Sequence, residues 1–244
     1  MNKPYIFAHR GAMAYCIENT MESFQKAVEM RVGIETDLRL TRDMRLICFH
    51  DPGFKIDDQW YFIKDLTYEE LKDIEFEDGR EVPTFEEILN AFRYCPKEFR
   101  YSCDIGNAKV GYAAIDIIKK FNNFHQVEIT DTRLWTLKKL RKYSLKIKLI
   151  HTIPYQIKEI NQDTIKFDKL RDYNINILNI KNDRATKENF KAVVDYGFKC
   201  YVWGVNSKNR MKKVLKLRYD EEFPRAIYTN YPDVLKKIRD KIYD

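Results

Sequence analysis

The sequence predicts an α/β protein, and among such folds it favours a closed (β/α)8 barrel, the TIM barrel. Short apolar runs alternate with longer amphipathic runs about eight times along the 244 residues. A repeated strand-then-helix order implies a parallel sheet with helices outside it. No low-complexity linker interrupts the pattern, so we expect a single domain over residues 1–244. About eight repeats in one domain favour a closed sheet over an open one.

The candidate strands are the apolar, β-rich runs. They are residues 5–8, 34–38, 46–49, 99–105, 127–130, 147–151, 175–180, 199–205 and 226–229. The run 46–49 follows the turn at 41–44, so we expect it to be an extra strand paired with the strand before it.

The candidate helices lie between these strands, at residues 20–30, 84–94, 111–121, 132–143, 186–196, 207–217 and 232–242. Thr67 and Thr84 each stand three residues before a glutamate, which is the pattern of a capping box. Asp131-Thr132 and Ser207 are suitable caps for the helices that follow them. Gly197 is a natural helix stop, and Pro232 fits just inside the last helix.

Two stretches break the alternation. Residues 52–82 form an insertion that we expect to pass over the barrel mouth, with a short helix at 68–74. The aromatic residues 60–62 within it either pack onto the barrel or contact a substrate head group or lipid. Residues 154–173 show poor periodicity and receive no assignment.

Composition indicates an ordinary globular protein. Hydrophobic residues make up 44% of the chain and charged residues 33%, with a net charge of +7. The basic residues are spread along helices, and no nucleic-acid-binding motif accompanies them, so we expect no nucleic-acid partner. Five cysteines at scattered spacings predict free thiols. No leader or long apolar segment is evident, so we expect a cytoplasmic protein, with peripheral membrane contact left open.

The first fifty residues carry the chemistry. His9 and His50 each follow a short apolar run, and therefore stand where a strand ends, which is where active sites of parallel α/β folds gather. Glu35 and Asp37 are two residues apart and share one face of a strand, an arrangement that suits a hard divalent cation. Two imidazoles, the arginine Arg10 and a cation are the groups that cleave a phosphodiester.

These motifs resemble the signature of the glycerophosphodiester phosphodiesterase family. The matching residues are His9-Arg10-Gly11, Glu18-Asn19-Thr20, Gly33-Ile34-Glu35-Thr36-Asp37, Thr41-Arg42-Asp43 and His50-Asp51. The resemblance continues at residues 66–71, 82–89, 202–206 and 227–232, whereas residues from about 123 to 191 carry no motif.

The resemblance implies a TIM barrel that uses a divalent cation, Ca or Mg. It also implies hydrolysis of glycerophosphodiesters, small-molecule substrates, to glycerol 3-phosphate and an alcohol. By position, His9 and His50 are the implied acid and base, and Arg10 is the implied phosphate ligand.

The resemblance implies further roles at the same site. Glu35 and Asp37 are implied metal ligands. Glu18 and Asn19 are expected to belong to the substrate pocket and to brace the loop that bears His9, and a position of Glu18 near the metal is left open. Trp203 is expected to form a wall of the substrate pocket.

The sequence departs from the family pattern at three positions. Asp104 stands where the family has a glutamate, and we expect it to be the third metal ligand. Gly106 replaces a lysine that helps to neutralise the phosphate, and Lys109 is the candidate to replace that charge. Asn230 stands where the family usually has an aspartate. If the missing charge limits the rate, the substitution Gly106→Lys is expected to raise turnover.

Two alternatives to hydrolysis remain open from the sequence. A weakened or inactive barrel would bind a phosphorylated ligand or lipid head group without turnover. A phospholipase D-like lyase would instead release a cyclic phosphate. The oligomeric state does not follow from the sequence.

Overall fold

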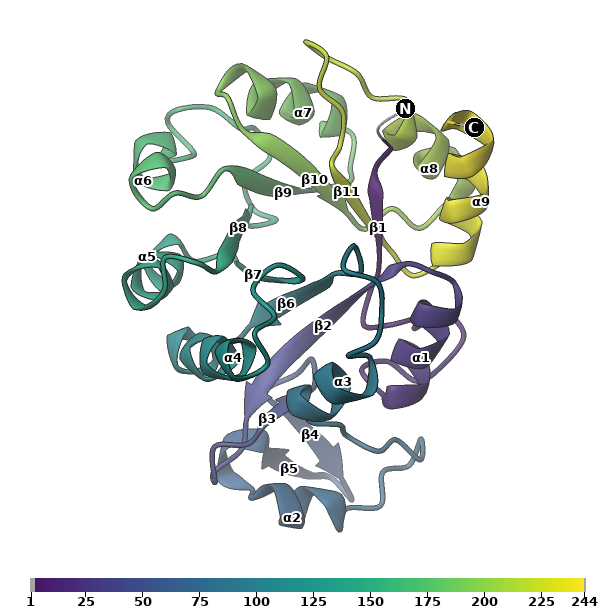
Figure 1. Ribbon diagram of the computed structural model, residues 1–244, viewed down its shortest axis with the longest axis vertical. Coiled ribbons are helices and arrows are strands. Elements are labelled where there is room, and N and C mark those ends of the chain that lie inside the picture. Colours follow the sequence, from purple (N-terminus) through teal and green to yellow (C-terminus); the bar gives the residue numbers. More distant parts are fainter. Residues whose placement is uncertain (1–2, 244) are drawn as a thin grey trace.

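The computed structural model describes residues 3–243 and contains a closed barrel of eight parallel strands (Figure 1). The strands are β1 (Tyr5–Ala8), β2 (Gly33–Leu40), β6 (Tyr101–Ile105), β7 (Val127–Asp131), β8 (Lys148–Thr152), β9 (Ile177–Lys181), β10 (Lys199–Trp203) and β11 (Ala226–Thr229). Strand β1 closes the barrel because it pairs in parallel with both β2 and β11. The predicted fold class is therefore confirmed.

Helices surround the barrel, as Figure 1 shows. They are α1 (Met21–Glu29), α3 (Phe85–Ala91), α4 (Ala108–Lys120), α5 (Leu134–Tyr143), α6 (Phe167–Asp172), α7 (Thr186–Asp195), α8 (Lys208–Leu215) and α9 (Pro232–Tyr243). Their apolar faces pack against the outside of the strands and bury residues such as Phe24, Leu140 and Leu235. Helix α6 lies in the stretch of poor periodicity that received no assignment.

The caps explain where several helices begin. Thr67 and Thr84 form the predicted capping boxes with Glu70 and Glu87, and the Ser207 hydroxyl accepts a hydrogen bond from a backbone amide in the first turn of α8. The predicted cap at Asp131-Thr132 is wrong. Asp131 ends β7, and α5 begins after Arg133 without a side-chain cap.

The barrel interior is filled in layers. A middle layer contains Phe7, Ile150, Ile177, Tyr201, Ala226 and Tyr228. Below it, near the amino ends of the strands, the carboxylate of Glu128 contacts the Arg100 guanidinium and lies 2.8 Å from Lys148 Nζ. Glu128 is 1% exposed, so its charge is neutralised inside the protein by these two cations. The apolar middle layer therefore separates this charged group from the polar side chains at the carboxyl ends of the strands.

The segment after β2 adds one strand to the edge of the main sheet and one separate two-stranded sheet. Strand β3 (Leu46–Cys48) pairs antiparallel with β2, as predicted, and β4 (Gly53–Ile56) pairs with β5 (Gln59–Phe62) in a separate hairpin. A 3-10 helix (Ile63–Asp65) and α2 (Tyr68–Lys72) follow, and Leu71 packs with Ile47.

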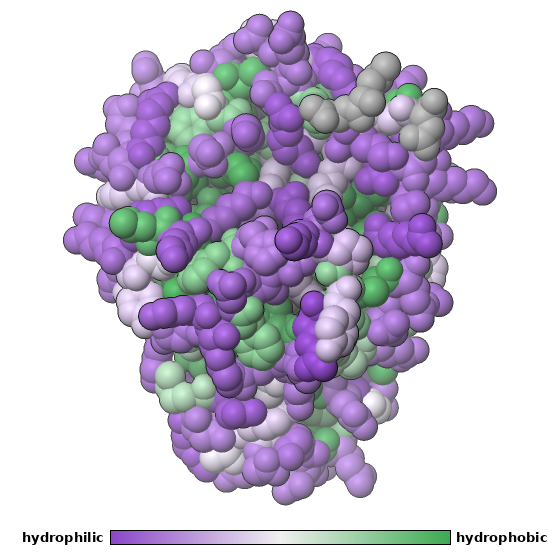
Figure 2. All heavy atoms as spheres, in the orientation of Figure 1, coloured by the Kyte–Doolittle hydropathy of each residue, from purple (hydrophilic) through white to green (hydrophobic). Residues whose placement is uncertain are grey.

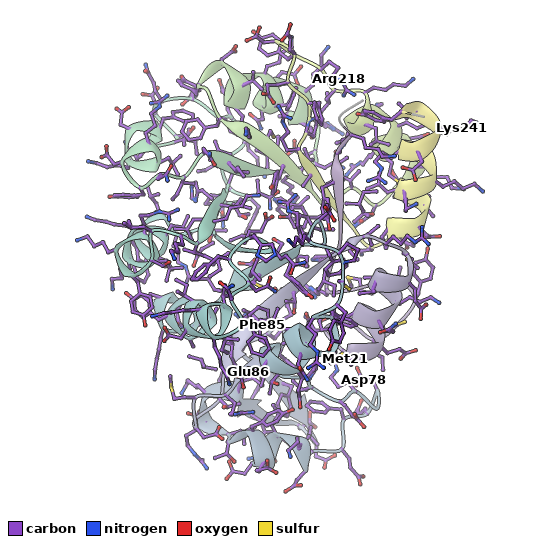
Figure 3. All side chains as sticks on the ribbon, viewed as in Figure 1. Met21, Asp78, Phe85, Glu86, Arg218 and Lys241 are labelled. Carbon is purple, nitrogen blue, oxygen red and sulfur yellow. The ribbon has the colours of Figure 1, made fainter. Side chains whose placement is uncertain are left out.

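The inserted segment lies beside the barrel next to β3 in Figure 1. Met21, in the first turn of α1, lines a groove together with Phe76 and Arg80 of the insertion, and Figure 3 labels Met21 and, from the insertion, Asp78. Within the described residues, none of 52–82 lines the cavity at the barrel mouth. The placement over that mouth therefore stays a prediction.

The surface is predominantly polar. Figure 2 shows hydrophilic side chains over most of one face, with hydrophobic ones between them. Trp60 and Phe62 are 59% and 44% exposed and stack on each other. The expectation that these aromatic rings pack onto the barrel is therefore wrong for these two residues. All five cysteines are free thiols, as predicted. No helix among residues 3–243 has the length and apolarity needed to span a membrane.

Candidate active site

A cavity of about 510 Å³ opens at the carboxyl ends of the barrel strands. It is lined by His9, Arg10, Glu35, Asp37, His50, Ser102, Asp104, Thr130, Thr132, Thr152, Ile153, Pro154, Tyr155, Gln156, Asn179, Trp203, Gly204, Asn206, Tyr228 and Asn230. The structure thus brings both predicted histidines, Arg10, the three predicted carboxylates and Trp203 to one cavity.

The loop after β1 is shaped by a close approach of two backbones. Gly11 has a φ of +74°, and a Cβ there would lie 2.3 Å from Ser23 Oγ at the start of α1. Only glycine fits both constraints. The tight turn sets His9 and Arg10 at the barrel mouth directly above β1.

Asn19 fixes the same loop to the second strand. Its Nδ2 donates to Asp37 Oδ2 at 3.1 Å, and its Oδ1 accepts from Thr36 Oγ1 at 2.7 Å. The side chain is buried, at 2% exposed, and it does not line the cavity. Its contacts agree with a bracing role.

His9 is oriented by Asn230, which follows β11. His9 Nδ1 lies 2.9 Å from Asn230 Oδ1, and this acceptor places the ring hydrogen on Nδ1. His9 Nε2 is then free, 3.9 Å from Glu35 Oε2. Burial and the neighbouring Arg10 guanidinium lower the pKa of His9. A neutral ring with a free nitrogen can accept a proton.

His50 has an orienting partner of its own. Its Nδ1 lies 2.9 Å from Asp51 Oδ1, the carboxylate of the next residue. The His50 side chain is 40% exposed. Each imidazole is therefore held through Nδ1 and presents Nε2 for proton transfer.

The carboxylates gather on two adjacent strands. Glu35 and Asp37 are two residues apart on β2 and therefore point to the same face of the strand. Asp37 stands beside Asp104 in the parallel register of β2 and β6. Burial and the charge of Asp37 raise the pKa of Glu35. Burial, Asp37 and Asp131 raise the pKa of Asp104 to about 7. Glu35 and Asp104 therefore hold protons more readily than isolated carboxylates do, because burial and the neighbouring acidic groups disfavour their charged forms.

This donor set suits a hard divalent cation, which prefers carboxylate oxygens. Among residues 3–243, no three Asp, Glu, His or Cys side chains already stand in an arrangement that could hold a metal ion. The suitability of Glu35, Asp37 and Asp104 for a divalent cation therefore rests on their carboxylate oxygens and on the repulsion between their charges, which a cation would relieve.

Arg10 is anchored inside this acidic group. Its Nη1 donates to Glu18 Oε2 at 2.8 Å, and its Nε lies 3.4 Å from Asp37 Oδ2. Arg10 Nε makes no hydrogen bond in the described structure, so this contact is electrostatic only. Glu18 does not line the cavity, and it acts on the site through Arg10.

Lys109 lies apart from these groups. It is exposed in the first turn of α4, and it is not among the residues that line the cavity. Its role as a phosphate ligand stays a prediction without support from its position.

The volume beside Gly106 is occupied by Arg39 of β2. A Cβ on Gly106 would lie 2.5 Å from Arg39 Nη1. The guanidinium donates to the carbonyl oxygens of His50, Leu38 and Asp51, the last two at 3.2 and 3.3 Å. Arg39 thus holds the backbone at His50, and its charge acts to lower the pKa of Asp104 against the larger effects that raise it.

Sequence reasoning missed Arg39 and also the polar residues of the opposite wall, such as Thr130, Thr152 and Asn179. Each of these three lines the cavity near the carboxyl end of a strand. Thr130 and Asn179 fall within the predicted runs, and Thr152 follows directly after the run 147–151. A polar residue in an otherwise apolar run was the available signal.

Two kinds of comparison relate the chain to known proteins by sequence. The model of the family described as "Glycerophosphoryl diester phosphodiesterase family" matches residues 9–234. The chain is 29% identical to a glycerophosphodiester phosphodiesterase of Bacillus altitudinis, over 97% of this chain and 98% of the relative. It is 26% identical to one of Caldanaerobacter subterraneus subsp. tengcongensis, over 96% of each chain.

Solved structures agree in fold. A glycerophosphodiester phosphodiesterase of Thermotoga maritima superposes with a TM-score of 0.77 and 22% identity, over 98% of this chain and all of the other. A phosphodiesterase of Oleispira antarctica, solved with the product sn-glycerol-3-phosphate, gives a TM-score of 0.81 and 16% identity, over 98% of this chain and 97% of the other. With the family match extending over most of its length, the chain belongs to the glycerophosphoryl diester phosphodiesterase family.

Proposed function

We propose that the protein hydrolyses glycerophosphodiesters to glycerol 3-phosphate and an alcohol. The observation that carries the proposal is the convergence of two separately oriented imidazoles and three carboxylates on one cavity. Membership of the family and the names of the relatives support the same activity.

In this proposal His9 acts as the general base. Asn230 holds the ring through Nδ1, and burial with Arg10 lowers the pKa of His9, so Nε2 takes a proton from the attacking water. The water oxygen bonds to phosphorus as the bond to the alcohol oxygen breaks. His50 gives that oxygen a proton while Asp51 holds the ring at Nδ1.

Arg10 binds a non-bridging phosphate oxygen, since its guanidinium lies at the cavity and is already anchored by Glu18. Glu35, Asp37 and Asp104 would hold a divalent cation, Ca or Mg. When bound, the cation supplies positive charge for the phosphate oxygens.

The activity is tested with glycerophosphocholine and, in parallel, bis(4-nitrophenyl) phosphate, each assayed with Ca or Mg and with a chelator. We expect turnover that the chelator removes and that His9→Ala and Asp37→Ala each lower by at least about 100-fold. The exposed Glu159→Ala is the matched control and is expected to behave as wild type.

Other outcomes identify the alternatives. Tight binding of glycerol 3-phosphate without turnover by the wild-type protein would indicate a binding protein and would contradict the proposal. A cyclic phosphate in the phosphorus NMR spectrum of the products would indicate a lyase. Cytoplasmic residence and peripheral membrane contact also stay predictions.

A further inference from the structure

The cavity has one charged half and one neutral half. Every charged or imidazole side chain that lines it comes from β1, β2, β6 or the loops that follow β1 and β3. The lining side chains of β7 to β10 are neutral, and they include Thr130, Thr152, Asn179 and Trp203. Because a phosphate belongs with the charged half, the neutral half is left for the group esterified to it.

Two buried polar atoms in the neutral half have no partner in the described structure. They are Asn179 Oδ1 and Trp203 Nε1. Asn179 is 5% exposed, and its other amide atom, Nδ2, donates to Thr152 Oγ1 at 3.3 Å. The Thr152 hydroxyl donates in turn to Thr130 Oγ1 at 3.3 Å. This chain sets the orientation of the carboxamide, so Oδ1 remains available as an acceptor.

An unpaired buried polar group costs free energy, and such groups in native proteins are normally satisfied by protein, water or ligand. Asn179 offers an acceptor and the Trp203 indole offers a donor. A hydroxyl is both donor and acceptor, so this pair is complementary to hydroxyl groups.

The rim of the neutral half disfavours a cationic occupant. Lys181 Nζ lies 5.5 Å from the Trp203 ring centroid and 5.7 Å from that of Tyr155, and both aromatic residues line the cavity. The lining side chains of β7 to β10 include no carboxylate to attract a quaternary ammonium group. A polyol fits this wall better than choline or ethanolamine.

We propose that Asn179 and Trp203 are specificity-determining residues that bind the hydroxyl groups of the glycerol moiety. Asn179 Oδ1 accepts from one hydroxyl, and Trp203 Nε1–H donates to a hydroxyl oxygen. The proposal rests on the proposed function for its placing of the phosphate, and it assigns the glycerol end of the substrate to the wall formed by β7 to β10.

The test compares variants on substrates with and without these hydroxyls. Asn179→Leu keeps the side-chain volume and removes the acceptor, and Trp203→Phe removes the N–H but keeps a ring. We expect each to lower kcat/KM for glycerophosphocholine by about 10- to 100-fold. The loss is expected to be at least about 10-fold smaller for bis(4-nitrophenyl) phosphate, which has no hydroxyl, so the ratio of the two losses is the readout. Asn176→Leu, at the opposite end of β9, is the matched control.

A binding measurement keeps the test independent of turnover. Calorimetry is performed with sn-glycerol 3-phosphate and with propyl phosphate, which lacks both free hydroxyls. The wild-type protein is expected to bind glycerol 3-phosphate about 10- to 100-fold more tightly, and Asn179→Leu is expected to lose that preference.

The possible results separate the two proposals. Equal affinity of wild type for both phosphates, or an unchanged preference in folded Asn179→Leu and Trp203→Phe, overturns the hydroxyl-binding role and leaves the proposed function intact. A preference that depends on Asn179 in a protein without turnover supports the binding role and contradicts the proposed function. Circular dichroism of each variant establishes that it is folded.

Discussion

At the scale of single residues, the site is built by neighbours that orient its reactive groups. His9 is held by Asn230, a side chain 221 positions away in the sequence, whereas His50 is held by the residue next to it. Both contacts are made through Nδ1. The geometry therefore depends on residues that do not touch the reacting atoms themselves.

The contact between His9 and Asn230 yields the first prediction. Asn230→Ala removes the acceptor that fixes the ring, so we expect kcat to fall by about 10- to 100-fold. KM is expected to change little, because Asn230 is proposed to orient the ring and not the phosphate. Initial-rate kinetics measure both. Asn90→Ala, at an exposed position of α3, is the control, and wild-type kcat in Asn230→Ala would contradict the orienting role.

Gly106 gives a second prediction, and it reverses the expectation drawn from the sequence. Because Arg39 Nη1 already lies 2.5 Å from the position of a Cβ, Gly106→Ala and Gly106→Lys both displace Arg39 from the backbone at His50. We expect kcat to fall about 10-fold, since small displacements of catalytic groups are costly.

A double-mutant cycle identifies the cause. If the collision with Arg39 is responsible, Gly106→Ala adds no further loss in an Arg39→Ala background. A rise in turnover for Gly106→Lys would show instead that missing charge limits the rate.

At the scale of elements, the strands and helices that the sequence predicted correctly are those marked by a local pattern of apolar residues. The bounds of β1 and β11 agree with the prediction, because each is a short apolar run bounded by polar or turn residues. Helix α6 and the hairpin of β4 and β5 were missed. Helix α6 has six residues, and each of the two strands has four. Segments this short contain too few residues for a helical or strand periodicity of apolar side chains to be recognised.

The candidate site shows the same division. His9, Glu35 and His50 were found because they fall in local motifs at strand ends. Asn179 was missed because a single polar residue in a buried strand has no periodic signal, and only the closed barrel shows that it faces the cavity. The role of Arg39 was missed because its guanidinium occupies the volume that a side chain at residue 106 would fill, and this neighbourhood is visible only when β2 and the end of β6 are placed side by side.

The last helix supplies a prediction about stability. Asp240 of α9 lies 3.2 Å from Lys3 Nζ, 3.0 Å from Lys236 Nζ and 2.8 Å from Arg239 Nη2. Burial opposes ionisation, but these three cations together lower the pKa of Asp240 from 3.8 to about 2.

The sign follows from this lowered pKa. The stabilisation of the folded protein by the ionised Asp240 and its three cations is fully present above pH 3.8, and it disappears as the pH falls through about 2. At pH 7, Asp240→Asn is expected to lower the free energy of unfolding by about 1–2 kcal/mol, and near pH 2 the difference vanishes. Urea unfolding at both pH values measures it, with the exposed Asp163→Asn as control. An equal loss at both pH values would rule out the ionic origin.

At the scale of the whole molecule, the barrel separates a polar lower plug from the functional upper end. Glu128 lies in the plug with Arg100 and Lys148, and Lys148 also donates to Tyr201 Oη at 2.9 Å. The hydrophobic middle layer stands between this plug and the cavity. The two ends therefore have different tasks: Glu128 and Lys148 of the lower plug are on β7 and β8, whereas the charged side chains of the cavity come from β2, β6 and the loops after β1 and β3.

The plug predicts a large effect on stability. Glu128→Ala leaves two buried or half-buried cations without their carboxylate, and we expect the free energy of unfolding to fall by about 3–5 kcal/mol. Chemical denaturation measures the change, and Glu159→Ala on the surface provides the comparison, with an expected change within about 0.5 kcal/mol. A loss below about 1 kcal/mol for Glu128→Ala would show that water reaches the two cations.

The sealed lower end has a kinetic consequence for the whole protein. Because the Glu128 plug and the apolar layer above it fill the lower part of the barrel, the cavity does not continue to the amino ends of the strands and opens at the mouth. In the proposed function, the substrate and both products would therefore pass through the mouth. With one route at the mouth, the proposed function requires that the products leave the cavity before the next substrate binds.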